Sequence, residues 1–184
     1  MKKIFALLSV GLLALGIVGC GAEDNGADEG GGEVYSVVEM SAIKDAIVEE
    51  LGEDYWPNMP LDSDMLEGFI GVSSDMYEDF LAEIPMISTN VDTLIVVRAK
   101  EDQADAVEKA MNDYRDVKVS NTMQYPQNLG KIQASKVARL GNYVIFVQLG
   151  GDVMDLLDQG DEAVIVHCQE VNDKVIEIIR TVIK

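Results

Sequence analysis

Hydrophobic and polar residues follow regular helical periods over much of the chain after residue 35. Apolar residues recur at spacings of three and four, which predicts amphipathic helices. The expected helices are 36–51, a short one from Asp62 or Ser63 to Gly68, 101–116, and a long one that begins at Asp161. Each buries one apolar stripe, so the helices must pack against another layer.

Two pairs of apolar runs predict β-hairpins, one over 78–88 and 91–100 and the other over 132–140 and 143–149. The run at 91–100 is apolar on both faces, which indicates a central strand. Because it contains Pro126, we expect 117–131 to be mostly loop. These elements predict an α+β fold, a two-layer domain in which helices pack on one face of an antiparallel sheet of about four strands, with a long C-terminal helix.

The first 19 residues have the pattern of an export signal. Two lysines precede the apolar run from Ile4 to Val18, which is too short for a permanent membrane span. Residues 17–20 (IVGC) resemble the lipobox of bacterial lipoproteins. The resemblance implies cleavage after Gly19 and acylation of Cys20, which would anchor the protein to the extracytoplasmic face of the cell membrane.

Residues 20–35 form an acidic, glycine-rich segment. Its composition cannot bury enough apolar surface to fold, so it is expected to be a tether between the lipid and a single globular domain over 36–184.

The chain is acidic, with 33 Asp and Glu against 14 Lys and Arg and a formal net charge of −19. This charge argues against nucleic-acid binding, which requires a basic face. Residues 117–151 nevertheless contain no acid, and Tyr125, Lys131, Lys136 and Arg139 in this segment are the candidate contact surface for an anionic ligand or an envelope protein. The alternative is that these bases offset the acidic half of the chain across an internal or dimer contact.

Candidates for catalysis or metal binding are few. Cys168 lies on the apolar seam of the last predicted helix and is interpreted as a core residue, with His167 beside it at the surface or boundary. Asp152, Asp155, Asp158 and Asp161 do not have the spacing of a calcium loop. We therefore predict no metal site, no cofactor and no catalytic residues. Tyr55 and Trp56 lie in a proline-containing loop, where they could stack on a ligand or plug the core.

Four segments, PMISTNVDTLIVVRAK (85–100), MNDYRD (111–116), MQYPQNLGKIQASKV (123–137) and GNYVIFVQLGG (141–151), resemble domain of unknown function 4358. The resemblance covers roughly 36–157 and implies a membrane-tethered α+β domain of bacterial lipoproteins, with no established activity. The expected function is a lipid-anchored binding or interaction module. An enzyme using carboxylate, lysine or tyrosine acid–base chemistry is the alternative, and a solute-binding accessory is a further one.

Overall fold

The structure is a computed structural model that describes residues 34–184. Cys20 and most of the predicted tether lie outside these residues. The elements, in chain order, are α1 (Met40–Leu51), η1 (Gly52–Asp54), β1 (Met59–Pro60), α2 (Ser63–Ile70), β2 (Tyr77–Ile84), β3 (Thr93–Ala99), α3 (Ala104–Ser120), α4 (Pro126–Gln133), β4 (Lys136–Leu140), β5 (Tyr143–Gln148), η2 (Met154–Gln159) and α5 (Asp161–Ile183).

Five strands form one antiparallel sheet in the order β1-β2-β3-β5-β4. The predicted α+β class, the antiparallel sheet and the long C-terminal helix are confirmed. β3 is the middle strand, as its doubly apolar pattern predicted. The additional strand is β1, a two-residue edge strand whose Met59 pairs with Ile84. Pro60 fits there because an edge strand does not need every backbone N–H.

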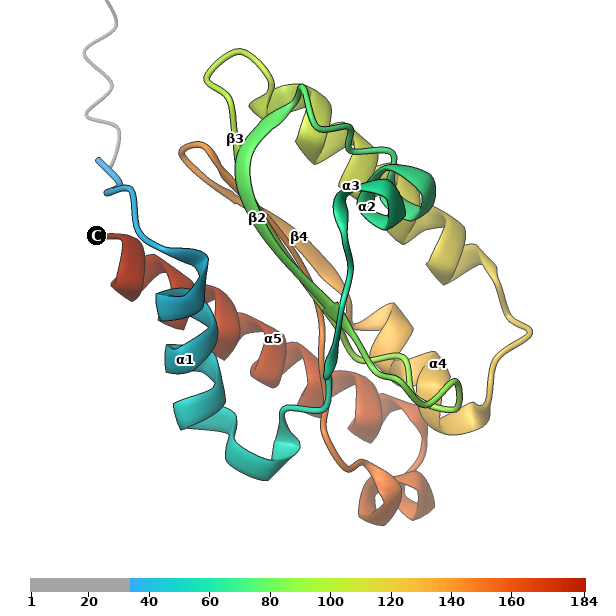
Figure 1. The fold of residues 1–184 in the computed structure, drawn as a ribbon. Helices are drawn as coiled ribbons and strands as arrows, with labels where there is room; N and C mark the ends of the chain where they lie inside the picture. Colours follow the sequence, from blue (N-terminus) through green and yellow to red (C-terminus); the bar gives the residue numbers. More distant parts are fainter. Residues whose placement is uncertain (1–33) are drawn as a thin grey trace, which may run out of the picture. The chain divides into compact units, whose positions relative to one another are not determined.

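Helices cover both faces of the sheet, so the prediction that they pack on one face is wrong. α1 and α5 lie on one side, and α2 and α3 lie on the other (Figure 1). In β3, Leu94 and Val96 pack in the first of these two cores, whereas Ile95 and Val97 pack in the second. Successive side chains of a strand point to opposite faces, so a continuous apolar run requires cover on both.

Two further differences concern element boundaries. The segment 117–131 is mostly helical rather than loop, because α3 continues to Ser120 and α4 begins at Pro126. Proline at the first helical position lacks only an N–H that would have had no intrahelical partner, so it starts α4 instead of breaking it. α1 begins at Met40, four residues after the predicted start at Ser36.

The residues before α1 are fixed to one end of the sheet. The backbone N–H of Ser36 donates to the carbonyl of Ile183 over 2.6 Å, and the Tyr143 hydroxyl donates to the Ser36 carbonyl over 3.1 Å. Tyr143 begins β5, and the strand ends five residues later at Gln148. With a rise of roughly 3.3 Å per residue, the chain enters the domain about 17 Å from the edge where β5 ends and β3 begins.

Candidate functional site

Lys136 and Arg139 do not form a joint basic surface. Both lie on the edge strand β4, three positions apart, and therefore point to opposite faces of the sheet. Lys136 forms an ion pair with Asp173 of α5, on one face. Arg139 forms ion pairs with Asp105 and Glu108 of α3, on the other face. The alternative interpretation, that these bases offset acids across internal contacts, describes both residues.

Lys131 was predicted to belong to an exposed contact surface, and this prediction is wrong. Its side chain is 2% exposed. Nζ lies 2.7 Å from Oδ1 of Asp92, which is itself fully buried, and donates to the carbonyl of Gly151 over 2.6 Å. Only Tyr125 of the four predicted contact residues keeps a largely exposed side chain without an ion pair, at 55%.

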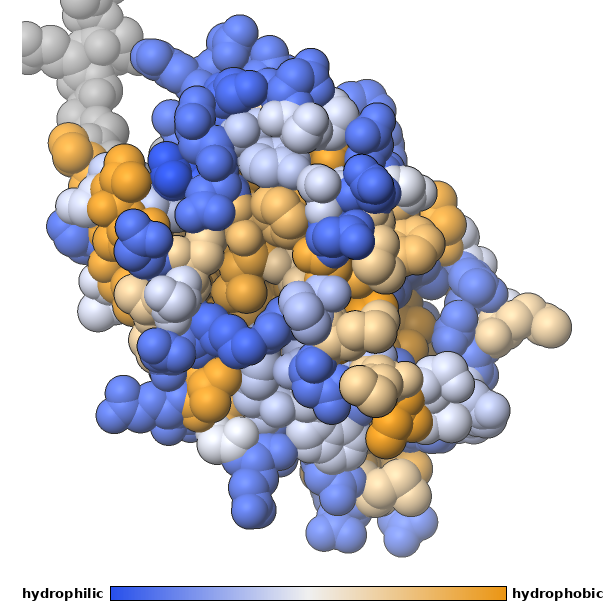
Figure 2. Space-filling view, viewed as in Figure 1, coloured by the Kyte–Doolittle hydropathy of each residue, from blue (hydrophilic) through white to orange (hydrophobic). Residues whose placement is uncertain are grey.

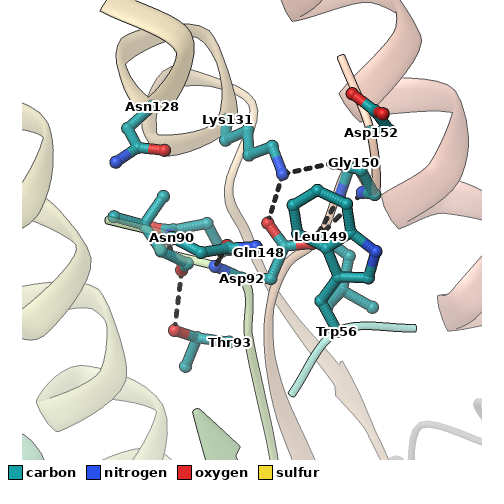
Figure 3. Close-up of polar contacts among 12 residues, drawn as sticks. Trp56, Asn90, Asp92, Thr93, Asn128, Lys131, Gln148, Leu149, Gly150 and Asp152 are labelled. Carbon is teal, nitrogen blue, oxygen red and sulfur yellow. Dashed lines mark hydrogen bonds and ion pairs between the residues drawn. The ribbon is translucent and has the colours of Figure 1, made fainter. Parts of the chain in front are cut away.

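Asp92 is the centre of a buried polar cluster that joins three elements (Figure 3). It directly precedes β3, and its Oδ2 accepts hydrogen bonds from the backbone N–H groups of Gly150 and Gly151, just after β5. Lys131 supplies the contact from α4. Burial raises the pKa of Asp92, whereas the ammonium of Lys131 and the two N–H groups favour the carboxylate. These contacts satisfy the buried charge and fix the ends of β3 and β5 to α4.

The two glycines after β5 allow this close packing. A Cβ on Gly150 would lie 2.6 Å from Sγ of Cys168, so a larger residue would displace the helix behind it. Gly151 has φ of +58°, a backbone conformation that other residues rarely adopt. The Gly-Gly pair is thus required for two adjacent backbone donors to face one carboxylate.

Trp56 covers the cluster. The Nζ of Lys131 lies 4.7 Å from the centroid of its ring, within the range of a cation–π contact. The indole Nε1 donates to the carbonyl of Glu53 over 3.0 Å. The ring is therefore held in one orientation between the buried ion pair and solvent, with 37% of the residue exposed.

A pocket of about 420 Å³, here called the Trp56 pocket, opens beside this ring. It is lined by Tyr55, Trp56, Asn58, Pro85, Ile87, Thr89 and Asn90. A smaller hollow of about 130 Å³ shares Trp56, Thr89 and Asn90 with it and reaches Lys131. Both lie at the edge where β3 begins and β5 ends, opposite the attachment of the segment before α1.

The loop between β2 and β3 forms one rim of the pocket and carries exposed apolar side chains. Met86 is 71% exposed and Ile87 is 66% exposed. Figure 2 shows apolar surface where this loop lies in Figure 1, next to hydrophilic groups. The loop is nevertheless anchored, because the buried amide of Asn128 donates to the carbonyl of Thr89 over 2.9 Å.

Tyr55 faces a second polar contact beneath the pocket. Its hydroxyl donates to Glu83 over 2.7 Å, and Lys44 of α1 lies 2.6 Å from the same carboxylate. Burial, followed by the hydrogen bond to Glu83, raises the pKa of Tyr55. The residue thus stabilises the wall of the pocket, while its neighbour Trp56 borders the open space.

The other chemical candidates have structural roles. Cys168 is fully buried, as predicted, and burial raises the pKa of its thiol to about 11. His167 is half-buried at the boundary and its Nε2 lies 3.1 Å from the carbonyl of Gly150. Asp152 accepts from the backbone N–H of Met154 at the start of η2. Within residues 34–184, no three His, Cys, Asp or Glu side chains are grouped to hold a metal ion, and no helix is long and apolar enough to cross a membrane.

Comparison with protein families gives a match over residues 50–149 to the model of the domain of unknown function (DUF4358). The chain belongs to this family. The matched DUF4358 segment runs from the end of α1 to the residue after β5 and includes Trp56, Asp92 and Lys131. Gly150, Gly151 and Cys168 follow it. Neither the curated proteins nor the solved structures contain a match to the DUF4358 chain.

Proposed function

We propose that this protein is a lipid-anchored binding module at the extracytoplasmic face of the cell membrane, and that it binds a small ligand in the Trp56 pocket. The pocket itself is the observation that carries the proposal. Its volume of about 420 Å³ lies in the range of small-molecule sites. The lipobox-like residues ending at Cys20 support the anchor.

The position of the pocket is consistent with a tethered receptor. The chain enters the domain beside Tyr143, at one end of β5, and the pocket lies beyond the other end, next to Gln148 and Asp92. The pocket therefore lies at the end of the sheet opposite the point where a tether would join Ser36, and the point of attachment itself does not block it.

The rigidity of the lining favours binding. Trp56 is held by Glu53 and Lys131, and Thr89 is held by Asn128 of α4. A site formed before the ligand arrives loses little side-chain freedom on binding.

The composition of the lining supports binding over acid–base catalysis. No Asp, Glu, Lys or His side chain lines the Trp56 pocket. Tyr55 is the one titratable group in the lining, and its hydroxyl is already bonded to Glu83. General acid–base chemistry requires a proton donor and a proton acceptor within reach of the substrate.

Fluorescence provides a direct test, because Trp56 is the single tryptophan of the chain. We expect a low-molecular-mass fraction of the producing cells' envelope to shift the emission of the purified full-length protein in a saturable way. Pro85→Trp or Ile87→Trp with Trp56→Phe moves the probe to the other wall and should report the same saturation. If no fraction changes the emission of either probe, the proposal is wrong.

A further inference from the structure

The Trp56 pocket lacks charged side chains although it belongs to a strongly acidic chain. Charged residues make up 26% of the sequence, and the formal net charge is −19. None of the seven lining residues is charged. An anionic ligand would enter without a compensating cation and against the net charge of the protein. A cationic ligand would compete with Lys131, which already lies over the Trp56 ring.

The polar side-chain groups left for a ligand are the NH₂ groups of two asparagines and the hydroxyl of Thr89, which can donate and accept. The Oδ1 of Asn58 accepts from the backbone N–H of Met86 over 2.8 Å, and the Oδ1 of Asn90 accepts from the backbone N–H of Asp92 over 2.7 Å. These contacts fix the orientation of both amides, because an NH₂ group cannot accept from an N–H. Neither Nδ2 group donates to another residue of the described chain. Both asparagines line the pocket, so their NH₂ groups are available to a ligand bound there.

The remaining lining is an apolar surface with one flat aromatic element. The Nε1 of Trp56 is bonded to Glu53, so a ligand meets the carbon surface of the indole. Pro85 and Ile87 extend this surface. A purely apolar ligand, such as an acyl chain, would cover the two NH₂ groups without replacing their bonds to water, which is unfavourable.

From these three properties we infer that the ligand of the Trp56 pocket is an uncharged saccharide. This inference rests on the proposed function of the pocket and names the chemical class of its ligand. A pyranose ring carries acceptor oxygens around its edge, which suit the NH₂ groups of Asn58 and Asn90. Its C–H face is apolar and slightly positive, which suits the negative face of an aromatic ring.

The test is a fluorescence titration of the full-length protein with N,N′,N″-triacetylchitotriose and with cellotriose, both neutral. We expect at least one of them to shift the Trp56 emission with saturation at millimolar concentration or below. Chitotriose, whose amines are cationic, and a trimer of galacturonate, which is anionic, should bind at least tenfold more weakly than the neutral ligand. Equal or tighter binding of either charged trimer would overturn the inference.

Asn58→Asp and Asn90→Asp test the named contacts. Each replacement keeps the Oδ1 that accepts the loop N–H but removes the NH₂ donor, so the loop is retained. Loss of one donor should weaken saccharide binding about tenfold, or roughly 1.4 kcal/mol. Asn121→Asp is the control matched to Asn90→Asp, because Asn121, like Asn90, accepts from the N–H two residues later, and it lies outside the pocket lining. Unchanged affinity in both pocket variants, with melting temperatures equal to the parent, would also overturn the inference.

Failure of this inference can be separated from failure of the proposed function. One outcome is that the envelope fraction shifts the emission, neither neutral trisaccharide does, and periodate treatment leaves the effect of the fraction intact. The pocket then binds a ligand, but the ligand is not a saccharide. If neither the fraction nor the saccharides act, both proposals are wrong. Loss of the fraction's effect after periodate, which cleaves vicinal diols, would support the saccharide.

Discussion

The ammonium of Lys131 lies 2.7 Å from the carboxylate of Asp92, and both side chains are buried. The pair joins α4 to the first residue before β3, and the backbone after β5 completes its hydrogen bonds. A buried charge that loses its partner is strongly unfavourable. The pair therefore makes the wall behind Trp56 sensitive to single substitutions.

We predict that Lys131→Met lowers the free energy of unfolding by about 3–5 kcal/mol, because it leaves the Asp92 carboxylate buried without a cation. Urea unfolding followed by circular dichroism measures this change. The double variant Lys131→Met with Asp92→Asn should lower the free energy of unfolding less than Lys131→Met alone, because no charge is then left buried without a partner. Lys136→Met is the control, since Lys136 pairs with the exposed Asp173 and should cost no more than about 1 kcal/mol. Equal effects at Lys131 and Lys136 would contradict the prediction.

The contact between α4 and α5 gives a prediction for a helical glycine. A Cβ on Gly130 would lie 2.6 Å from Cγ1 of Val164. Gly130→Ala should therefore destabilise the domain by about 1–3 kcal/mol through overpacking. Gly68→Ala in α2 is the matched change, because nothing lies within 4 Å of the added atom there. It should stabilise the domain by about 0.5–1 kcal/mol through helix propensity. Thermal unfolding of the two variants should move the midpoint in opposite directions.

Lys118 provides a prediction for pH dependence. Burial lowers the pKa of this lysine from 10.5 to about 8, and its Nζ donates to the Tyr114 hydroxyl over 3.2 Å. Between these two pKa values the unfolded chain binds more protons than the native chain, so this residue makes the free energy of unfolding rise with pH. Lys118→Met should remove that rise and stabilise the protein at pH 7 by about 1–3 kcal/mol.

The measurement for Lys118 is a series of urea unfolding curves from pH 7 to pH 10. At each pH, the free energy of unfolding of the Lys118→Met variant is subtracted from that of the parent protein. Lys109→Met, on the exposed side of the same helix, controls for the loss of one positive charge. A parent-minus-variant difference that does not change across this range would show that Lys118 does not titrate there.

The predicted lipid anchor is tested at Cys20. Replacement by Ala removes the thiol that would carry the diacylglycerol, so incorporation of labelled palmitate should fall to background and the protein should leave the membrane fraction. Cys168→Ala is the control, since that thiol is buried in the domain. Palmitate labelling that persists in the Cys20 variant and disappears in the Cys168 variant would reverse the assignment.

Local patterns in the sequence were sufficient for most of the fold. The spacing of apolar residues predicted α5 from Asp161, and the doubly apolar run predicted the central place of β3. The doubly apolar run of β3 also requires helices on both faces of the sheet. A two-layer arrangement, which is the simpler expectation for these elements, does not supply them. The sequence pattern does not reveal α4, because a proline inside a segment usually indicates a break, whereas Pro126 occupies the first helical position.

The candidate site was less accessible to sequence reasoning because its residues come together only in the fold. Asp92 and Lys131 are 39 positions apart, and Trp56 lies on a different segment again. An acid-free stretch of sequence indicated an exposed basic surface, yet Lys131, Lys136 and Arg139 each form an ion pair with an acid that is distant in the sequence. The available signals were Asp92 directly before an apolar strand and the Gly-Gly pair directly after another, both typical of polar contacts at a strand end.

The bond between Ser36 and Ile183 brings the two termini of the domain together, as Figure 1 also shows. A reporter or affinity tag fused after Lys184 would consequently lie next to the segment before α1, away from the Trp56 pocket. Immobilisation through such a tag would therefore hold the domain at the end of the sheet opposite the Trp56 pocket.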